Sequence, residues 1–351
     1  MTKYEAVVSS YAGMKSCCRH ISAIPSISDK TMFAVGSAIV GKSNQIQILE
    51  YNEIKASIQC TQTLDYPDEI WWIECHPTES NIFSIISSKP REKNANICKI
   101  PSSSPGGSST HQETEILTTF TLTDPTPQRI FYLPSDSKKC VISTNTTINL
   151  FDIEDPTKSI STITDNEIKG TSIDQIHEGI VAGCCGSSIK LWDLRAGSVV
   201  HQIDNAHSPT ALDVSFNDNK QWWICTGGYD GYIRCWDSRV GKAECEFRAS
   251  SHWVTRTIPS VSHEQLILTA GTDSKVRIFN SSVFAFQNEG QLPDGEIIKS
   301  IRHDDSVYCA TWASNNPWIF ASVSYKGQVN ICQLPSQVVD SILIGEDDLS
   351  L

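Results

Sequence analysis

Short apolar runs alternate with turn residues along most of this chain. The clearest runs are INLFD, IKLWD, IRCWD and VRIFN, which place Phe151, Trp192, Trp236 and Phe279 at equivalent points. Each run is rich in Ile or Val and is bounded by Gly, Asn, Asp or Ser, which is typical of β-strands rather than helices. The pattern therefore predicts an all-β protein.

These endings recur at an interval of roughly 40–45 residues, the length of one four-stranded propeller blade. The third strands of successive repeats are expected near Ile48, Ile97, Leu150, Leu191, Cys235, Ile278 and Ile331. A closed ring of repeats forms one unit. We therefore expect a seven-bladed β-propeller over residues 1–340, followed by an acidic tail at residues 341–351.

The ring must also close, because an unpaired sheet edge promotes aggregation. The segment after the last third strand matches a strand poorly, whereas residues 4–9, YEAVVS, match one well. We expect this N-terminal segment to be the outer strand of the seventh blade.

Two segments interrupt the repeat, each of them between a third and a fourth strand. Residues 101–114 are rich in Ser, Pro and Gly, and residues 281–300 have a polar middle part. Segments with so few apolar residues bury too little surface to order themselves. We expect both to be flexible insertions.

The fifth repeat resembles the WD-repeat family most closely. Its residues His207, Thr226, Asp230 and Trp236 stand at the positions of the buried histidine, hydroxyl, aspartate and tryptophan of that family. The resemblance implies a hydrogen-bonded structural set. A catalytic His–Asp pair is the weaker interpretation, because buried donors such as an indole N–H need acceptors in any case.

The same positions degenerate in the later repeats. The sixth repeat has His252, Thr269 and Asp273 but Phe279 in place of tryptophan, and the seventh has Cys332 there. We expect apolar contacts to dominate in these two blades.

Composition narrows the class of function. The chain has 28 Lys and Arg against 40 Asp and Glu, a formal net charge of -12, which disfavours nonspecific binding to nucleic acid or anionic lipid. No apolar run approaches the roughly 18–20 residues that span a bilayer, and MTKYEAVVSS lacks the pattern of a signal peptide. We expect a cytoplasmic, monomeric protein without membrane insertion.

The 13 cysteines are mostly embedded in apolar strands, as in IRCWD, so we expect reduced, buried thiols. The chain has no paired CxxC spacing that would indicate zinc, and it lacks the GxSxG, GxxxxGK[ST] and HExxH motifs. The sequence therefore predicts a protein-interaction scaffold that is not an enzyme and has no metal or cofactor.

Residues 205–331 resemble the family of propellers that interact with two vesicle-tethering complexes, the endosome-associated recycling protein (EARP) and Golgi-associated retrograde protein (GARP) complexes. The segments that carry the resemblance include SHWVTRTIPSVSHEQLILT and NPWIFAS, and the match is weaker upstream. The resemblance implies a noncatalytic partner of tethering subunits in endosomal recycling and retrograde transport, peripheral to the trans-Golgi network and endosomes.

Two alternatives remain open. Arg195 and Arg239 complete two successive WDxR sequences, a pattern found in substrate receptors of cullin-type ubiquitin ligases, where the guanidinium could pair with adaptor carboxylates. Such an arginine can also bond to its own turn. A third possibility is a chromatin propeller that binds basic histone tails, although the acidic residues are dispersed along the chain.

The partner-binding surface is expected on the upper face, where residues early in the inner strands meet the turns between second and third strands. Aromatic residues and arginine are enriched at binding hot spots. We select Tyr229, Trp253, Arg256 and Asp305 first. The wider set is Glu69, Trp71, Thr210, Tyr308 and Tyr325.

Overall fold

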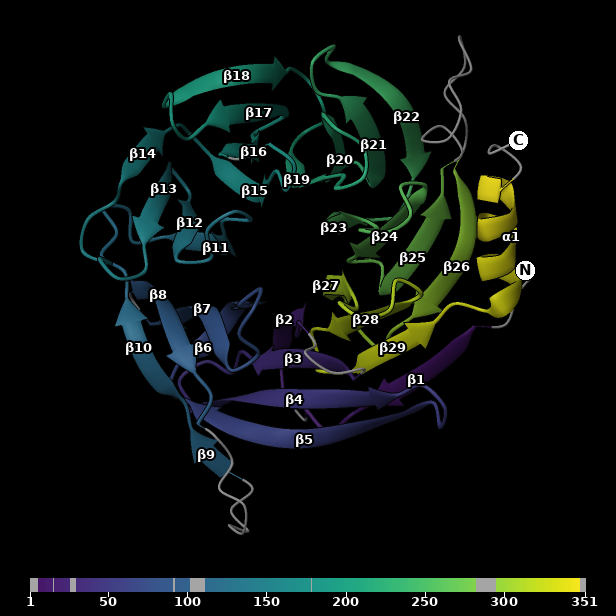
Figure 1. Ribbon diagram of the computed structural model, residues 1–351, viewed down its shortest axis with the longest axis horizontal. Helices are drawn as coiled ribbons and strands as arrows, with labels where there is room; N and C mark the ends of the chain where they lie inside the picture. The colour runs from purple at the N-terminus through teal and green to yellow at the C-terminus, as the bar shows by residue number, and fades with distance from the viewer. Residues whose placement is uncertain are drawn as a thin grey trace.

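The computed structural model describes residues 6–14, 16–25, 30–90, 92–101, 111–177, 179–281 and 295–347. Seven sheets surround a central axis (Figure 1). They form a seven-bladed β-propeller, which confirms the predicted fold class.

Each blade is antiparallel, with its strands numbered outward from the axis. Blade 1 contains β2 (Cys18–Ala23), β3 (Thr31–Ser37), β4 (Asn44–Asn52) and β5 (Ser57–Tyr66), and blade 2 contains β6 (Glu69–Cys75), β7 (Ile82–Lys89), β8 (Glu92–Lys99) and β10 (Glu115–Thr119). Blade 3 contains β11 (Pro127–Tyr132), β12 (Lys139–Thr144), β13 (Thr147–Asp152) and β14 (Ser161–Thr164), and blade 4 contains β15 (Ile168–Ile173), β16 (Ile180–Cys185), β17 (Ser188–Asp193) and β18 (Ser198–Ile203). Blade 5 contains β19 (Ala211–Phe216), β20 (Trp223–Gly228), β21 (Tyr232–Asp237) and β22 (Lys242–Arg248), and blade 6 contains β23 (Val254–Pro259), β24 (Leu266–Gly271), β25 (Lys275–Asn280) and β26 (Glu296–Arg302). Blade 7 contains β27 (Val307–Trp312), β28 (Ile319–Ser324), β29 (Val329–Gln333) and β1 (Val7–Tyr11).

The hydrophobic pattern explains how the blades pack. The second strands β20, β24 and β28 are buried at every residue, because neighbouring blades cover both faces. Third strands such as β21 alternate between buried and half-buried residues. Each of the seven positions predicted for a third strand lies in β4, β8, β13, β17, β21, β25 or β29, so the predicted repeat is confirmed.

The N-terminal strand closes the ring as predicted. Strand β1 pairs antiparallel with β29, from Val7 opposite Gln333 to Tyr11 opposite Val329. The strand lies slightly later than the predicted residues 4–9, of which residues 4 and 5 fall outside the described part. Both ends of the chain thus belong to one side of the ring (Figure 1).

Every inner strand carries an irregularity in its pairing directly after its first residue. The shifts lie between Cys18 and His20, Ile70 and Trp72, Pro127 and Arg129, Ile168 and Thr171, Ala211 and Asp213, Val254 and Arg256, and Val307 and Cys309. A bulge redirects the side chains that follow it. The residues after the unpaired position therefore converge on the axis, where we call the set the channel ring. Its members are His20, Trp72, Arg129, Gly170, Asp213, Arg256 and Cys309.

Part of the first predicted insertion is ordered. Strand β9 (His111–Glu113) adds to the outer edge of β5 in parallel, so blade 1 has five strands. The Thr114 hydroxyl donates to the Asp65 carbonyl at 2.9 Å, and the Gln62 amide donates to Gln112 at 2.7 Å. The expectation of a flexible segment throughout residues 101–114 was therefore wrong at its end, since backbone pairing orders a polar segment without apolar burial. Residues 102–110 lie outside the described part.

The second predicted insertion is also shorter than expected, because β26 begins at Glu296 rather than after residue 300. Residues 282–294 lie outside the described part. The outer strand pairs with β25 from Lys275 opposite Arg302 to Asn280 opposite Glu296.

The C-terminal segment is a helix rather than an irregular tail. Helix α1 (Ser336–Asp347) crosses the boundary predicted between residues 340 and 341, and it lies outside the ring beside β26 (Figure 1). Val338 and Ile342 share one face of the helix and are buried together with Leu334. Within the described residues, no helix is long and apolar enough to cross a membrane.

Candidate protein-interaction surfaces

The four residues singled out in the fifth repeat meet inside blade 5. His207 Nε2 lies 2.8 Å from Thr226 Oγ1, which also accepts the Trp236 indole N–H at 2.9 Å. On the other side of the ring, His207 Nδ1 lies 3.0 Å from Asp230 Oδ1, and Arg234 Nη1 donates to Asp230 Oδ2 at 2.8 Å. Burial opposes ionisation of Asp230, but hydrogen bonds from His207 and Arg234 hold its pKa below the usual 3.8. The set is buried and its polar atoms are engaged within the blade, so its role is structural.

The sixth repeat does not form the corresponding set. His252 is exposed and its ring contacts the Thr272 hydroxyl instead of Thr269. Buried Ser250 precedes the inner strand of blade 6 by the same number of residues as His207 does in blade 5. The assignment of His252 is therefore corrected to Ser250.

The channel ring holds the most buried ion pairs of the described residues. Arg129 Nη2 lies 2.6 Å from Asp213 Oδ1, and Arg256 Nη1 lies 3.3 Å from the same oxygen. The other oxygen of Asp213 accepts the Thr257 backbone N–H at 2.7 Å. Arg129 comes from blade 3, so its side chain passes blade 4 at Gly170. A Cβ atom on Gly170 would lie 2.3 Å from the Leu212 carbonyl oxygen, which explains the glycine.

The position of Arg256 corrects one sequence prediction. Its side chain is only 15% exposed and is held by Asp213, so it belongs to the channel wall rather than to an exposed contact surface. The bulge in β23 is the physical reason, because it turns this side chain toward the axis.

A first aromatic surface lies on the upper face over blades 4 to 6, and we call it the Trp253 surface. The Tyr229 and Trp253 rings stack with centroids 4.5 Å apart and an interplanar angle of 11°. Lys169 Nζ lies 5.4 Å from the centre of the Tyr229 ring. Trp253 remains 39% exposed, so this ring can contact a partner. Two of the four selected residues are thus brought together.

A second aromatic surface lies on the same face over blades 7, 1 and 2, and we call it the Trp71 surface. Arg19 Cζ lies 4.2 Å and Lys93 Nζ 3.8 Å from the centre of the Trp71 ring. The Tyr308 and Tyr325 rings form an edge contact at 5.8 Å, and Arg19 faces both.

Sequence reasoning selected the aromatic residues of this second surface but missed Arg19 and Lys93. Arg19 follows the first residue of an inner strand in CRHISA, a position that the rule for the upper face covers. Asp305, the fourth selected residue, lies apart from Trp253, with its carboxylate 4.0 Å from Lys326 Nζ.

The two WDxR sequences form self-contained turns. The backbone N–H of Arg195 donates to Asp193 at 2.7 Å, and that of Arg239 donates to Asp237 at 3.0 Å. The Arg239 guanidinium also grips Asp237 with two contacts, Nη2 to Oδ2 at 2.6 Å and Nε to Oδ1 at 3.0 Å. The fork of Arg239 is therefore occupied by its own turn.

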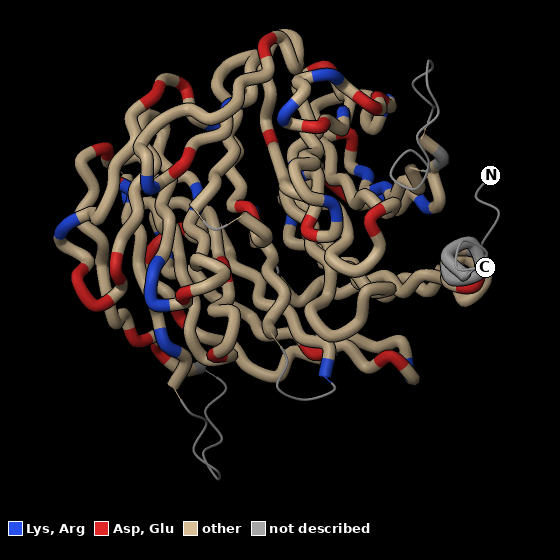
Figure 2. The backbone as a smooth tube through the Cα atoms, turned by 45° about the horizontal axis from the view of Figure 1, so that its top comes forward, with Lys and Arg blue, Asp and Glu red and all other residues tan. Residues whose placement is uncertain are grey.

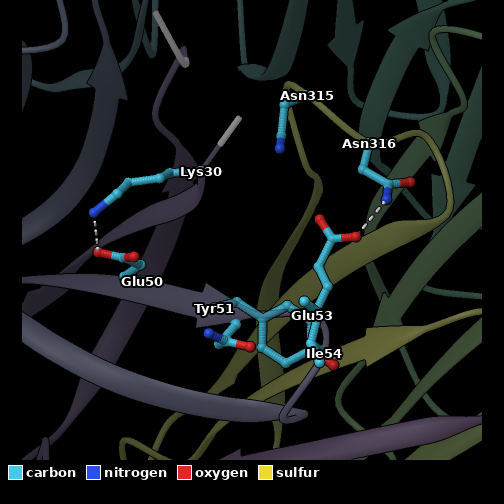
Figure 3. Close-up of a pocket in the computed structure, with 8 residues that line it drawn as sticks. Lys30, Glu50, Tyr51, Glu53, Ile54, Asn315 and Asn316 are labelled. Atoms are coloured by element: carbon cyan, nitrogen blue, oxygen red, sulfur yellow. Dashed lines mark hydrogen bonds and ion pairs between the residues drawn. The ribbon is translucent and has the colours of Figure 1, made fainter. Parts of the chain in front are cut away.

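A polar pocket of about 510 Å³ opens between blades 1 and 7 (Figure 3). Its polar side chains largely satisfy one another. Lys30 Nζ lies 3.0 Å from Glu50 Oε2, and Asn316 Nδ2 donates to Glu53 Oε2 at 3.0 Å. The pocket therefore offers few groups to a ligand.

Comparison with known proteins places this scaffold in a family. A profile described as EIPR1 beta-propeller matches residues 6–279, and a WD domain, G-beta repeat profile matches residues 295–332. The chain belongs to the EIPR1 beta-propeller family. Both profiles describe propeller repeats, a fold that typically serves as an interaction scaffold.

Relatives match this family member over nearly their whole length. The rat protein "EARP and GARP complex-interacting protein 1" is 26% identical over 95% of this chain and 98% of its own length. The Caenorhabditis elegans "EARP-interacting protein 1" is 28% identical over 90% of this chain and 94% of its own. The Arabidopsis thaliana "WD repeat-containing protein DWA2" is 26% identical over 91% and 94%. The resemblance predicted from sequence is confirmed.

Proposed function

We propose that this protein is a noncatalytic scaffold that binds subunits of EARP- and GARP-like vesicle-tethering complexes. The observation that supports this most strongly is the extent of the similarity, because relatives named for interaction with these complexes match 95% of the chain. The whole propeller, rather than one generic repeat, is therefore shared. Its place would be endosomal recycling and endosome-to-Golgi retrograde transport.

The upper face offers the contact surface that this proposal needs. Trp253 and Tyr229 present a stacked, partly exposed pair, and a stacked pair has little side-chain freedom left to lose on binding. Both residues stand on turns of buried strands, so the surface is rigid before a partner arrives. We assign the first contact with a tethering subunit to the Trp253 surface.

The remaining parts of the proposal concern location and state. The protein would act as a cytoplasmic monomer, peripheral to the trans-Golgi network and endosomes, through protein contacts rather than membrane insertion. Figure 2 shows Asp and Glu at turns around the ring, interspersed with Lys and Arg. Such a surface supports a protein partner better than a continuous anionic membrane.

Affinity purification of the tagged chain tests the proposal. Tethering subunits should be recovered with the wild-type protein and lost with the Tyr229→Ala, Trp253→Ala double variant. Val240→Ala is the matched control, because Val240 is 67% exposed in a turn after a third strand, away from this surface. Recovery of tethering subunits with neither the wild type nor the control would contradict the proposal.

The same purification separates the two alternatives. A ligase adaptor that is lost in an Arg195→Ala, Arg239→Ala variant would support the cullin-type receptor. Histones would support the chromatin propeller. Retained binding of tethering subunits in the double variant at Tyr229 and Trp253 would place their contact elsewhere on the ring.

A further inference from the structure

Two positive side chains from different blades converge on one indole ring in the Trp71 surface. Arg19 belongs to β2 of blade 1 and Lys93 to β8 of blade 2, and both lie within about 4 Å of the Trp71 ring centre. Burial, and the charge of Arg19 after it, lower the pKa of Lys93 below its usual 10.5. The site therefore holds two like charges at close range.

Little in the protein neutralises this pair. Within the part of the chain that the structure describes, no carboxylate forms an ion pair with Arg19 or Lys93. Glu69 is the acidic group that acts on Lys93, and its carboxylate accepts the Trp71 indole N–H at 3.2 Å. Two cations against one carboxylate leave a local positive charge in a chain whose formal net charge is -12.

The channel beneath this surface reinforces the positive field. Arg129 and Arg256 lie 4.9 Å and 5.2 Å from the ring centre of Trp72, and both share the single carboxylate of Asp213. The other acid in the channel, Glu74, is partly protonated at neutral pH because burial raises its pKa to about 7. A positive field at the mouth of a narrow channel attracts anionic groups.

Aromatic residues complete the surface on the side of blade 7. Tyr308 and Tyr325 meet edge to face, and the Arg19 guanidinium lies between 5 and 6 Å from each ring centre (5.7 Å and 5.6 Å). Their rings offer an apolar wall beside the two cations. The combination fits a segment that carries carboxylates next to an apolar side chain.

We propose that the Trp71 surface binds an acidic linear segment of a partner protein, with carboxylates on Arg19 and Lys93 and an apolar side chain against Tyr308 and Tyr325. This goes beyond the proposed function, because it assigns the recognised chemistry to a second surface, distinct from the Trp253 surface. It holds whichever tethering subunit is bound.

Peptide binding to the purified full-length chain tests the proposal without any tethering complex. The probe is a fluorescein-labelled, end-capped hexapeptide of alternating Glu and Phe, measured by fluorescence anisotropy against the same peptide with Gln for Glu. We expect the Glu peptide to bind at least about tenfold more tightly, and this preference to weaken as salt is raised. An Arg19→Gln, Lys93→Gln double variant should lose the preference.

Lys42→Gln is the matched control, because Lys42 is an exposed lysine in the turn between β3 and β4 of blade 1. It should bind the Glu peptide as the wild type does. Unfolding temperatures of all variants establish that the ring remains intact.

Three outcomes would overturn the proposal. These are equal affinity for the Glu and Gln peptides, an unchanged preference in the double variant, and no binding up to about 1 mM, the weak end of specific affinity. Inorganic phosphate that displaces the Glu peptide at low millimolar concentration would instead indicate a site for phosphorylated groups. Failure here would leave the recovery of tethering subunits untouched, so the two proposals are tested separately.

Discussion

Blades 5 and 2 bury a hydrogen-bonded set at the same place and build it from different residues. His207 precedes Ala211 in blade 5 by the same number of residues as Tyr66 precedes Ile70 in blade 2. Each ring lies under the upper face, between the outer strand of one blade and the inner strand of the next. The fold therefore fixes the location of a buried polar group, but it does not fix its chemistry.

The chemistry of blade 2 is neutral throughout. The Asn96 amide donates to the Tyr66 hydroxyl at 2.8 Å, that hydroxyl lies 3.3 Å from Ser87 Oγ, and Thr119 donates to Asn96 at 2.9 Å. Blade 5 instead contains the ionised Asp230 with Arg234 beside it. A neutral set and a charged set should respond differently to mutation and to pH.

The same two blades also differ in the carboxyl group that each sends into the channel. Asp213 of blade 5 is fully buried and contacts two guanidinium groups and a backbone N–H. Glu74 of blade 2 is stabilised by Arg256 and Arg129 only through their charge, so burial dominates and raises its pKa to about 7. One carboxylate is paired and the other is not.

Removing the paired carboxylate should have the largest effect. Asp213→Asn leaves Arg129 and Arg256 buried with no neutralising partner in contact, and we expect a loss of about 3–5 kcal/mol in the free energy of unfolding. Urea denaturation at pH 7 measures it. A loss below that of Asp230→Asn would show that solvent in the channel screens the two arginines.

The next effect tests the charged set in blade 5. Because the pKa of Asp230 is lower in the folded protein than its usual 3.8, its contribution is complete above about pH 4 and disappears as pH falls further. Asp230→Asn should therefore destabilise by about 1–2 kcal/mol at pH 7, since part of the carboxylate meets water. The difference from the wild type should shrink toward pH 2, which denaturation at several pH values measures. A constant difference would mean that Asp230 contributes through shape rather than charge.

The unpaired carboxyl in blade 2 should show the opposite sign. The folded-state pKa of Glu74 is raised from 4.5 to about 7, so the folded protein loses stability as pH rises between these values. Glu74→Gln removes this penalty and should stabilise the protein by about 1 kcal/mol at pH 8, with little effect at pH 4. The change in unfolding temperature at the two pH values measures it. Stabilisation that is larger at pH 4 than at pH 8 would refute the assignment.

The contrast between these blades also shows how far the sequence alone could lead. The repeat and its third strands need only an apolar run and a turn, so even Ile97 in degenerate blade 2 could be placed. The set around Tyr66 could not, because Tyr and Asn at these positions match no recurrent motif. Arg19 and Lys93 meet only because two blades adjoin, and Arg256 turns inward only because its strand is bulged. The set around His207 could be predicted because its residue types recur together in one family.

The smallest expected effect tests whether the set in blade 2 behaves as a neutral network. Tyr66→Phe removes one hydroxyl that serves Asn96 and Ser87, and we expect a loss of about 1 kcal/mol. Burial raises the pKa of Tyr66 above its usual 10, so the hydroxyl stays neutral at all lower pH values. The loss should therefore be the same at pH 3 and pH 8, whereas that of Asp230→Asn differs, and parallel denaturation curves at both pH values measure the two variants together. If Tyr66→Phe followed the pH dependence of the variant in blade 5, the polar sets of the two blades would be energetically coupled through the channel ring, and the separation between a charged and a neutral blade would fail.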